Sequence, residues 1–440
     1  MEETKLHNEG LDPEFTHEPV PLQYRKSFAT VAGTWFGYPM SLSNAVFGGM
    51  IVGYLGVKDG LLAILIGALL LFAYVGALSY RAGNTGMNFP LMAKTSFGTK
   101  GYAIVTAFLA TTGIGWFAFQ TGLTGNMIHS TFGINEYLMT ALGGVFYIWL
   151  VFVGIRALSI IGWFAAPMFL ILSIVAIIFA MEEFSFTQLV NYQPKHTTPI
   201  EVFSIGAAIS IVFGGFSDAG TMTADYTRWA KNGRHSVWAA FTAFPVADFI
   251  AYAVGGLIVA TGIIANPTVD GGNFMLFLTG HNTLLSILLF LFVFINLGAS
   301  CSHCLYNGAI TWANITGKKL KTMIAIIGVL GTVAALAGVW GLFPYWLNLL
   351  GIFIPPVGGI MILDQLVFRK NELSQDAPAW KVMPFITWAL ASGIAALVYW
   401  KAPYASYAVI GVISAIIIHS VSFFATNSKS KVSIEGGNIS

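Results

Sequence analysis

The chain has 440 residues, of which 56% are hydrophobic and only 9% are charged. Soluble domains carry about 25% charged residues, so this composition excludes an ordinary soluble protein. A net charge of +2 excludes a nucleic-acid binder, and two cysteines exclude a scaffold held by several disulfides. High hydrophobicity also argues against intrinsic disorder. The remaining class is a polytopic membrane protein.

Twelve stretches are apolar enough and long enough to cross a bilayer as helices, which takes about 20 residues each. Continuous apolar runs beside Gly and Pro favour helices over a barrel, whose strands would alternate in polarity. The predicted spans cover residues 28–54, 59–80, 101–131, 137–155, 157–181, 201–222, 236–265, 283–312, 322–340, 343–367, 383–400 and 403–425.

The distribution of Lys and Arg predicts the orientation of these spans, because cytoplasmic loops accumulate basic residues. With twelve spans and the N-terminus inside, all but three of the 21 basic residues fall on the cytoplasmic side, and the exceptions are Lys58, Lys195 and Lys401. We therefore expect cytoplasmic tails at 1–27 and 426–440, no signal peptide and no appended soluble domain.

Two of the predicted spans contain helix-breaking residues. The first carries Gly-Tyr-Pro-Met-Ser at 37–41, and the sixth carries three glycines, two hydroxyls and a carboxylate within 214–221. Interrupted helices at corresponding places in two halves are typical of secondary transporters built from inverted repeats. The spacing predicts a ten-helix core at 28–367, with repeats at about 28–181 and 201–367, followed by two peripheral helices at 383–425.

Asp218 lies inside the second of these interruptions. A carboxylate near the middle of a membrane is costly and marks a functional site by default. It could accept hydrogen bonds from a substrate or carry a coupling proton, but it could also be satisfied by the N–H groups of its own broken helix. Asp248 in the seventh span is a second intramembrane acid, for which structural and functional roles are equally open.

Aromatic residues in the third and sixth spans suggest a site for a flat ligand. Gly113, Trp116 and Gln120 share one face of the third span at helical spacing, and an indole offers a stacking surface with one N–H donor. Aromatic residues on one face of a membrane helix more often pack against neighbouring helices than bind a ligand. Phe216 in the second interruption supplies another ring, and two rings from different helices could sandwich a flat molecule.

The eighth span presents Asn296, Ala299, Ser300 and His303 on one face. A backbone carbonyl and a hydroxyl one turn later, facing the carbonyls of a broken helix, could hold sodium, but Ala299 contributes no side-chain oxygen. His303 can titrate near neutral pH, and the alternative is a core histidine bonded to a carbonyl. A phosphate-binding G-x-x-x-x-G-K-[ST] sequence is absent, so ATP-driven transport is not expected.

Several short motifs resemble one family. They are GTMTADY at 220–226, GWF at 115–117, LY at 305–306 with ANITG at 313–317, and IPPVGG at 354–359 with Asp364 beyond it. At these residues, over about 25–425, the chain resembles the nucleobase:cation symporter-1 family, in particular its cytosine and purine permease branch.

The resemblance implies an all-α fold of twelve transmembrane helices. It has a five-plus-five inverted repeat in which helices 1 and 6 are broken, plus two peripheral helices. It also implies alternating access, uptake of a flat heterocycle coupled to Na⁺ or H⁺, and no enzymatic activity or cofactor. By the same resemblance, Trp116 and Phe216 fall on the two stacking aromatics of the family. The positions of its sodium site fall on Gly33, Gly37, Asn296 and Ser300.

The chain departs from the cytosine permease pattern at four positions. Gly113 replaces a glutamine, Gly215 and Asp218 replace serines, and Ala299 replaces a hydroxyl ligand of the ion site. The first three changes suggest a ligand other than cytosine, with a donor or positive charge facing Asp218. Candidates are a purine, a thiamine-precursor pyrimidine or a hydantoin-like compound. The change at Ala299 favours a proton, with Asp218 or His303 as its carrier.

We therefore expect a monomeric symporter of the inner membrane, with both termini cytoplasmic, that takes up a nucleobase-like heterocycle. The alternative within transport is proton-coupled uptake of the thiamine-precursor pyrimidine or hydantoin-like compound. A membrane channel is the alternative from a different class, although a channel would show polar faces on several helices and no paired breaks. The expected substrate-binding residues are Gly113, Trp116, Gln120, Gly215, Phe216, Ser217 and Asp218, and the expected cation-coupling residues are Gly33, Gly37, Asn296, Ser300 and His303.

Overall fold

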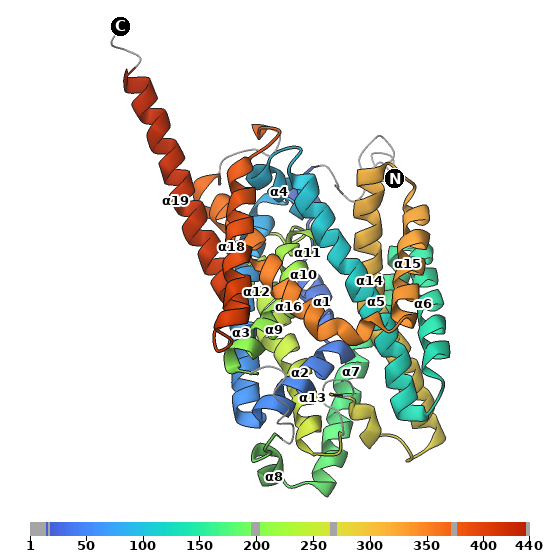
Figure 1. The fold of residues 1–440 in the computed structure, drawn as a ribbon. Helices are drawn as coiled ribbons and strands as arrows, with labels where there is room; N and C mark the ends of the chain where they lie inside the picture. Colours follow the sequence, from blue (N-terminus) through green and yellow to red (C-terminus); the bar gives the residue numbers. More distant parts are fainter. Residues whose placement is uncertain (1–14, 16–17, 195–202, 265–270, 371–375, 437–440) are drawn as a thin grey trace.

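The computed structural model describes residue 15 and residues 18–194, 203–264, 271–370 and 376–436 (Figure 1). Over these ranges the protein is built from helices, without a strand. Nine of the described helices are long and apolar enough to cross a membrane, and three shorter apolar helices accompany them. The three are α2 (Leu42–Leu55), α9 (Ile205–Gly215) and α15 (Leu320–Leu336), which fall in predicted spans one, six and nine.

The helices follow one another in the predicted order. The first half contains α1 (Phe28–Gly37), α2, α3 (Val57–Thr85), α4 (Phe89–Phe97), α5 (Tyr102–Phe132), α6 (Glu136–Val153), α7 (Ile155–Glu183) and α8 (Phe186–Val190). The second half contains α9, α10 (Ser217–Thr221), α11 (Ala224–Thr227), α12 (Gly233–Phe241), the π-helix η3 (Thr242–Asp248), α13 (Phe249–Ala260), α14 (Thr283–Thr316), α15, α16 (Phe343–Phe353), α17 (Pro355–Leu363) and the π-helix η6 (Asp364–Phe368). The last two helices are α18 (Val382–Lys401) and α19 (Tyr407–Gly436).

The connecting segments gather at two ends of the molecule, with α4 at one end and α8 at the other (Figure 1). At the α4 end, Arg81 Nη2 donates to the carbonyl oxygen of Lys370 at 2.6 Å, and Lys381 Nζ donates to that of Thr95 at 2.7 Å. At the opposite end, Ser204 Oγ donates to the carbonyl oxygen of Pro403 at 2.5 Å. The basic residues Arg81, Lys370 and Lys381 therefore lie at the same end of the molecule.

The described part of the N-terminal segment packs on the helices, although the sequence predicted a solvated tail over 1–27. Val20 N–H donates to the carbonyl oxygen of Gly86 at 2.9 Å. Arg25 is 9% exposed, and its guanidinium donates to the carbonyl oxygens of Gly83 at 2.5 Å and Ala230 at 3.4 Å. The guanidinium thus provides hydrogen-bond donors for backbone carbonyls near the end of α3 and just before α12. The distribution of charges along the sequence does not predict these contacts. Residues 1–14, 16 and 17 lie outside the described residues.

The C-terminal helix is longer than the sequence predicted. The twelfth span was expected to end at residue 425, but α19 continues to Gly436 and projects beyond the other helices (Figure 1). Most of the segment 426–440 is therefore helical rather than an irregular tail. Residues 437–440 lie outside the described residues.

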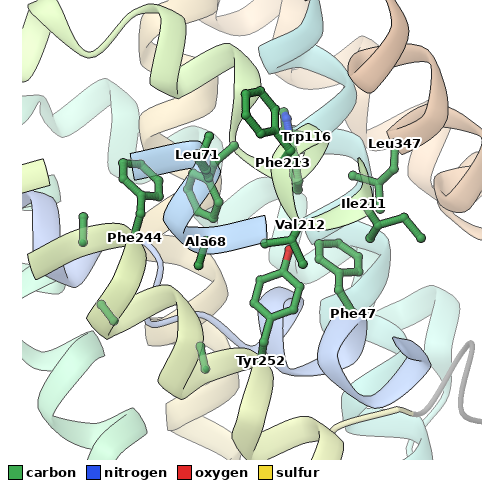
Figure 2. Packing of buried hydrophobic residues seen from close by; sticks show 14 of the residues in the cluster. Phe47, Ala68, Leu71, Trp116, Ile211, Val212, Phe213, Phe244, Tyr252 and Leu347 are labelled. Carbon is green, nitrogen blue, oxygen red and sulfur yellow. The ribbon is translucent and has the colours of Figure 1, made fainter. Parts of the chain in front are cut away.

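The two halves pack against each other through their broken helices. In the first half α2 packs along α13, and in the second half α9 packs along α3. Each broken span therefore packs against the second span of the other half, as two inverted units require. The contact between α2 and α13 depends on glycine, because a Cβ on Gly48 would lie 1.8 Å from the carbonyl oxygen of Tyr252. Aromatic and aliphatic side chains from α2, α3, α9 and α13 fill the core between them (Figure 2).

Two asparagines satisfy the backbone of the first break, which lies between α1 and α2. Asn296 of α14 accepts from the N–H of Leu42 and donates to the carbonyl oxygen of Met40, both at 2.8 Å. Asn44 of α2 donates to the carbonyl oxygen of Pro39 at 2.7 Å. Because unpaired backbone groups are costly away from water, these amides make the break tolerable in the middle of the bundle.

The second break lies at Phe216, between α9 and α10, and its partners are local. Ser217 Oγ donates to the carbonyl oxygen of Gly214 at 3.0 Å, and Thr221 Oγ1 donates to that of Ser217 at 2.6 Å. The hydroxyl of Tyr74 on α3 lies 2.5 Å from that of Thr221, which ties the short helix α10 to α3. Both interruptions predicted from Gly and Pro are thus present.

Replacing Asn296 tests the bridge across the first break. Asn296→Ala leaves the N–H of Leu42 and the carbonyl of Met40 without this partner, at a cost of about 1–3 kcal/mol for each buried group. We expect the melting temperature of the purified protein in detergent to fall by several degrees. The matched control is Asn307→Ala on the same helix, which removes one hydrogen bond to the hydroxyl of Tyr226. Equal losses in the two variants would contradict the proposed bridge.

Candidate functional site

A small cavity lies where the two breaks meet. It is lined from the first break by Tyr38 and Ser41, from α2 by Ser43 and Asn44, from α5 by Trp116 and Gln120, from the second break by Gly215, Phe216, Asp218 and Ala219, and from α14 by Ser300. Side chains from both breaks and from three further helices therefore converge on one space.

Three aromatic rings from different segments border this cavity. Tyr38 and Phe216 pack edge to face with ring centroids 5.6 Å apart, one from each break. Trp116 of α5 is 6% exposed and packs edge to face against Phe343 at 4.9 Å and Phe47 at 6.3 Å. Packing on the far side thus holds the indole in place while it lines the cavity, and both predicted stacking residues reach the same space.

Asp218 is the acid that lines the cavity. Its Oδ1 accepts from the N–H of Ala219 at 2.7 Å, its Oδ2 accepts from Thr112 Oγ1 at 3.1 Å, and the side chain of Trp116 is a further hydrogen-bond partner. In the described part of the chain, no Lys or Arg forms an ion pair with it. An ionised carboxylate has about four acceptor sites, so Asp218 keeps capacity for a donor on a ligand.

Gln120 supplies the complementary group. Its Oε1 accepts from Ser300 Oγ at 2.5 Å. The Nε2 donors have no partner among the described residues, and the side chain lines the cavity. The site therefore offers acceptors at Asp218 and donors at Gln120.

Six predicted site residues do not line the cavity: three are the predicted sodium positions Gly33, Gly37 and Asn296, and the others are Gly113, Ser217 and His303. A Cβ on Gly113 would lie 3.2 Å from the carbonyl oxygen of Cys304, so this position faces α14. Ser217 is fully buried, with its hydroxyl bonded to the backbone of the second break. His303 Nδ1 lies 2.6 Å from the carbonyl oxygen of Ala299, and its ring packs against Tyr38 with centroids 6.1 Å apart.

The structure does not bring the predicted sodium positions together as a set of free oxygens. The side-chain oxygen of Asn296 bonds Leu42 N–H, and the hydroxyl of Ser300 bonds Gln120. Gly33 is exposed on α1, and Gly37 is half-buried at the end of that helix. No cluster of His, Cys, Asp and Glu able to hold a metal ion occurs among the residues that the structure describes.

Sequence reasoning missed the cavity residues contributed by the first break and α2. Tyr38, Ser41, Ser43 and Asn44 all line the cavity. The signal was present, because two serines and an asparagine within four residues interrupt an apolar run. The predicted break covered only residues 37–41, Ser43 and Asn44 were given no role, and none of these four side chains was assigned to the site.

The chain is similar to known permeases along most of its length. The family model for permeases for cytosine/purines, uracil, thiamine and allantoin matches residues 19–382. The cytosine permeases of Escherichia coli strain K12 and Escherichia coli O157:H7 are each 30% identical to it over 360 residues, which is 82% of this chain and 83% of theirs.

Solved structures show the same fold. The inward-facing conformation of Mhp1 has a TM-score of 0.81 at 18% identity and covers 95% of this chain and 94% of that chain. Mhp1 in a closed conformation with bromovinylhydantoin bound, a nucleobase-cation-symport-1 family transporter, has a TM-score of 0.75 at 19% identity over 96% of both chains. A Na⁺-coupled sialic acid symporter has a TM-score of 0.59 at 14% identity over 90% of this chain and 95% of that chain.

Proposed function

This chain belongs to the family of permeases for cytosine, purines, uracil, thiamine and allantoin, the nucleobase:cation symporter-1 family, and we propose that it imports a flat nitrogen heterocycle by cation-coupled alternating access. It is a multi-pass membrane transporter, not an enzyme. The observation that carries the proposal is one cavity, shared by both helix breaks, that combines Trp116, Phe216 and Asp218.

The ligand lies between the rings of Trp116 and Phe216. Stacking suits any flat heterocycle because every such ring has a π-face, so the two side chains set the shape of the ligand but not its identity. The polar edge of the ligand selects it, with its donor on Asp218 and an acceptor on the amide of Gln120. An aminopyrimidine or a purine presents both kinds of group on one edge. Cytosine is the substrate named for the curated relatives.

The remaining parts of the proposal concern the membrane. We place the protein in the inner membrane as a monomer, with both termini and the basic α4 end in the cytoplasm, because Lys and Arg accumulate there. The transport core covers 28–367 and the peripheral helices fall within 383–425. The coupling ion is Na⁺ or H⁺. The loss of a hydroxyl at Ala299 and the use of the Asn296 oxygen by Leu42 favour H⁺.

Trp116→Ala tests the stacking site. Removing the indole takes away a stacking surface that is worth about 1–3 kcal/mol for a base, so we expect uptake to weaken by roughly 5- to 150-fold. Trp116→Phe keeps an aromatic ring and should therefore retain part of the uptake. The measurement is uptake by cells of radiolabelled cytosine, adenine, uracil, a thiamine-precursor aminopyrimidine and hydantoin. The matched control is Trp149→Ala, since Trp149 of α6 is 56% exposed and lies outside the cavity. Unchanged uptake by Trp116→Ala would rule out stacking there.

Asp218→Asn tests the anchoring carboxylate. The amide keeps the shape of the side chain but loses the charge, and a hydrogen bond to a charged group contributes about 1.5–3 kcal/mol. We expect binding of amino-bearing heterocycles to weaken by about ten- to a hundredfold, measured by thermal-shift titration of the purified protein with the same panel. Asp59→Asn, at an exposed position in the first turn of α3, is the control. Wild-type affinity in Asp218→Asn would assign Asp218 a structural role only.

A further inference from the structure

Asp248 is a second carboxyl group inside the helix bundle, and it lies outside the cavity. It is the last residue of the π-helix η3 and is 0% exposed. Its Oδ1 accepts from Asn44 Nδ2 at 3.0 Å, and its Oδ2 has no hydrogen-bond partner in the described part of the chain. A fully buried acid with one unused oxygen is a costly feature that needs an explanation.

The charges around Asp248 do not include a cation. The elements packed against η3 are α1, α3, α12 and α13, and Asn44 approaches from α2. Helix α1 carries no ionisable side chain, and the facing group of α13 is Tyr252, whose hydroxyl is also buried without a partner among the described residues. The ionisable residues of the other two helices lie elsewhere. On α3, the hydroxyl of Tyr74 bonds that of Thr221, and the remaining ionisable residues lie toward the ends of the helix, at Lys58, Asp59, Tyr80 and Arg81. On α12, Arg234 and His235 lie in the first turn.

An ionised carboxylate in such surroundings is strongly disfavoured, because a buried charge must be paired or neutralised. The side chains that face Asp248 offer one amide and one phenol, and neither neutralises it. A sodium ion requires several oxygen ligands, and the described neighbours supply few that are unused. A proton can neutralise the carboxylate by binding to Oδ2 alone, without further ligands.

Asn44 connects Asp248 to both the first break and the cavity. Its amide donates one hydrogen bond to the carbonyl oxygen of Pro39 and one to Asp248 Oδ1, and the same residue lines the cavity. Hydrogen bonds to an ionised acceptor are about twice as strong as those between neutral groups. The charge on Asp248 therefore changes how tightly the amide is held between the acid and the broken helix.

The hydroxyl of Tyr252 provides a second connection, to the other break. It lies 2.9 Å from the place that a Cβ on Gly215 would occupy, and its ring points from α13 toward Val212 of α9 (Figure 2). Asp248 and Tyr252 thus lie between α2 and the end of α9, and each contacts a segment that borders the cavity.

We propose that Asp248 is the proton-coupling carboxyl group of this transporter and that Asn44 transmits its protonation state to the first break and the cavity. The proton occupies Oδ2 while the ligand is loaded, and it leaves to water when the site opens on the side of release. This assignment rests on the proposed transport function and adds the residue that carries the coupling ion.

The experiment uses the full chain reconstituted in sodium-free liposomes. Exchange of labelled against unlabelled heterocycle at equal pH, with the panel compound that the wild-type protein transports, measures transport without coupling. Accumulation driven by a pH gradient measures coupling, and one pH unit supports roughly tenfold accumulation at one proton per substrate. We expect Asp248→Asn to keep exchange while its accumulation ratio falls to about one. Asp248→Glu should restore part of the accumulation, and Asp59→Asn should behave as wild type.

The outcomes separate this inference from the proposed function. Gradient-driven accumulation by Asp248→Asn, or wild-type accumulation that requires a sodium gradient, would overturn the assignment while leaving transport intact. Wild-type protein that exchanges none of the panel compounds would contradict the proposed function and this inference together. If Asp248→Asn does not fold, acidification of the liposome interior on addition of substrate is compared between wild-type protein and Asp248→Glu. Weaker acidification by Asp248→Glu supports the assignment, whereas acidification equal to that of wild type, or exchange by wild-type protein without acidification, overturns it.

Discussion

The fold depends on satisfying backbone groups that two helix breaks leave unpaired inside an apolar bundle. No water is available in the core of a membrane to replace the missing hydrogen bonds, so side chains must supply them. At the first break Asn296 and Asn44 bond Met40, Leu42 and Pro39, and at the second break hydroxyls of α10 bond its own backbone. These polar groups lie beside the cavity in which we propose that a polar ligand is held.

Asn44 illustrates how one side chain serves several roles. It pairs a backbone carbonyl of the first break, contacts the buried Asp248 and borders the cavity. Helix α2, which carries it, is held against α13 by glycines that bring the two backbones into contact. In this arrangement a change of charge at Asp248 acts within one hydrogen bond of the cavity, without a long chain of intermediate contacts.

The sequence was sufficient to predict the apolar spans and both breaks, and it singled out Trp116, Phe216 and Asp218, which line the cavity, because each has a local signal. The thickness of the bilayer sets how many apolar residues a span needs, and Gly and Pro within such a run indicate a break. An acid inside a span, such as Asp218, is noticed because burying its charge in a membrane costs free energy. Which face of α2 borders the cavity depends on how the halves pack, so Ser43 and Asn44 were missed. The bridge that the side-chain amide of Asn296 makes to the backbone of the first break was also missed, because it depends on how α14 packs against the break. The anchoring of Arg25 was missed because its acceptors are backbone carbonyls, which are the same in every sequence.

The central claim is that a flat heterocycle binds in the cavity that the two breaks share. The most direct measurement is an experimental structure of the protein with the compound that it transports. The account predicts a ring between Trp116 and Phe216, with a donor on its edge within hydrogen-bond distance of the Asp218 carboxylate. A ligand bound elsewhere, or one in this cavity whose edge faces away from Asp218 and whose ring contacts neither aromatic side chain, would contradict it.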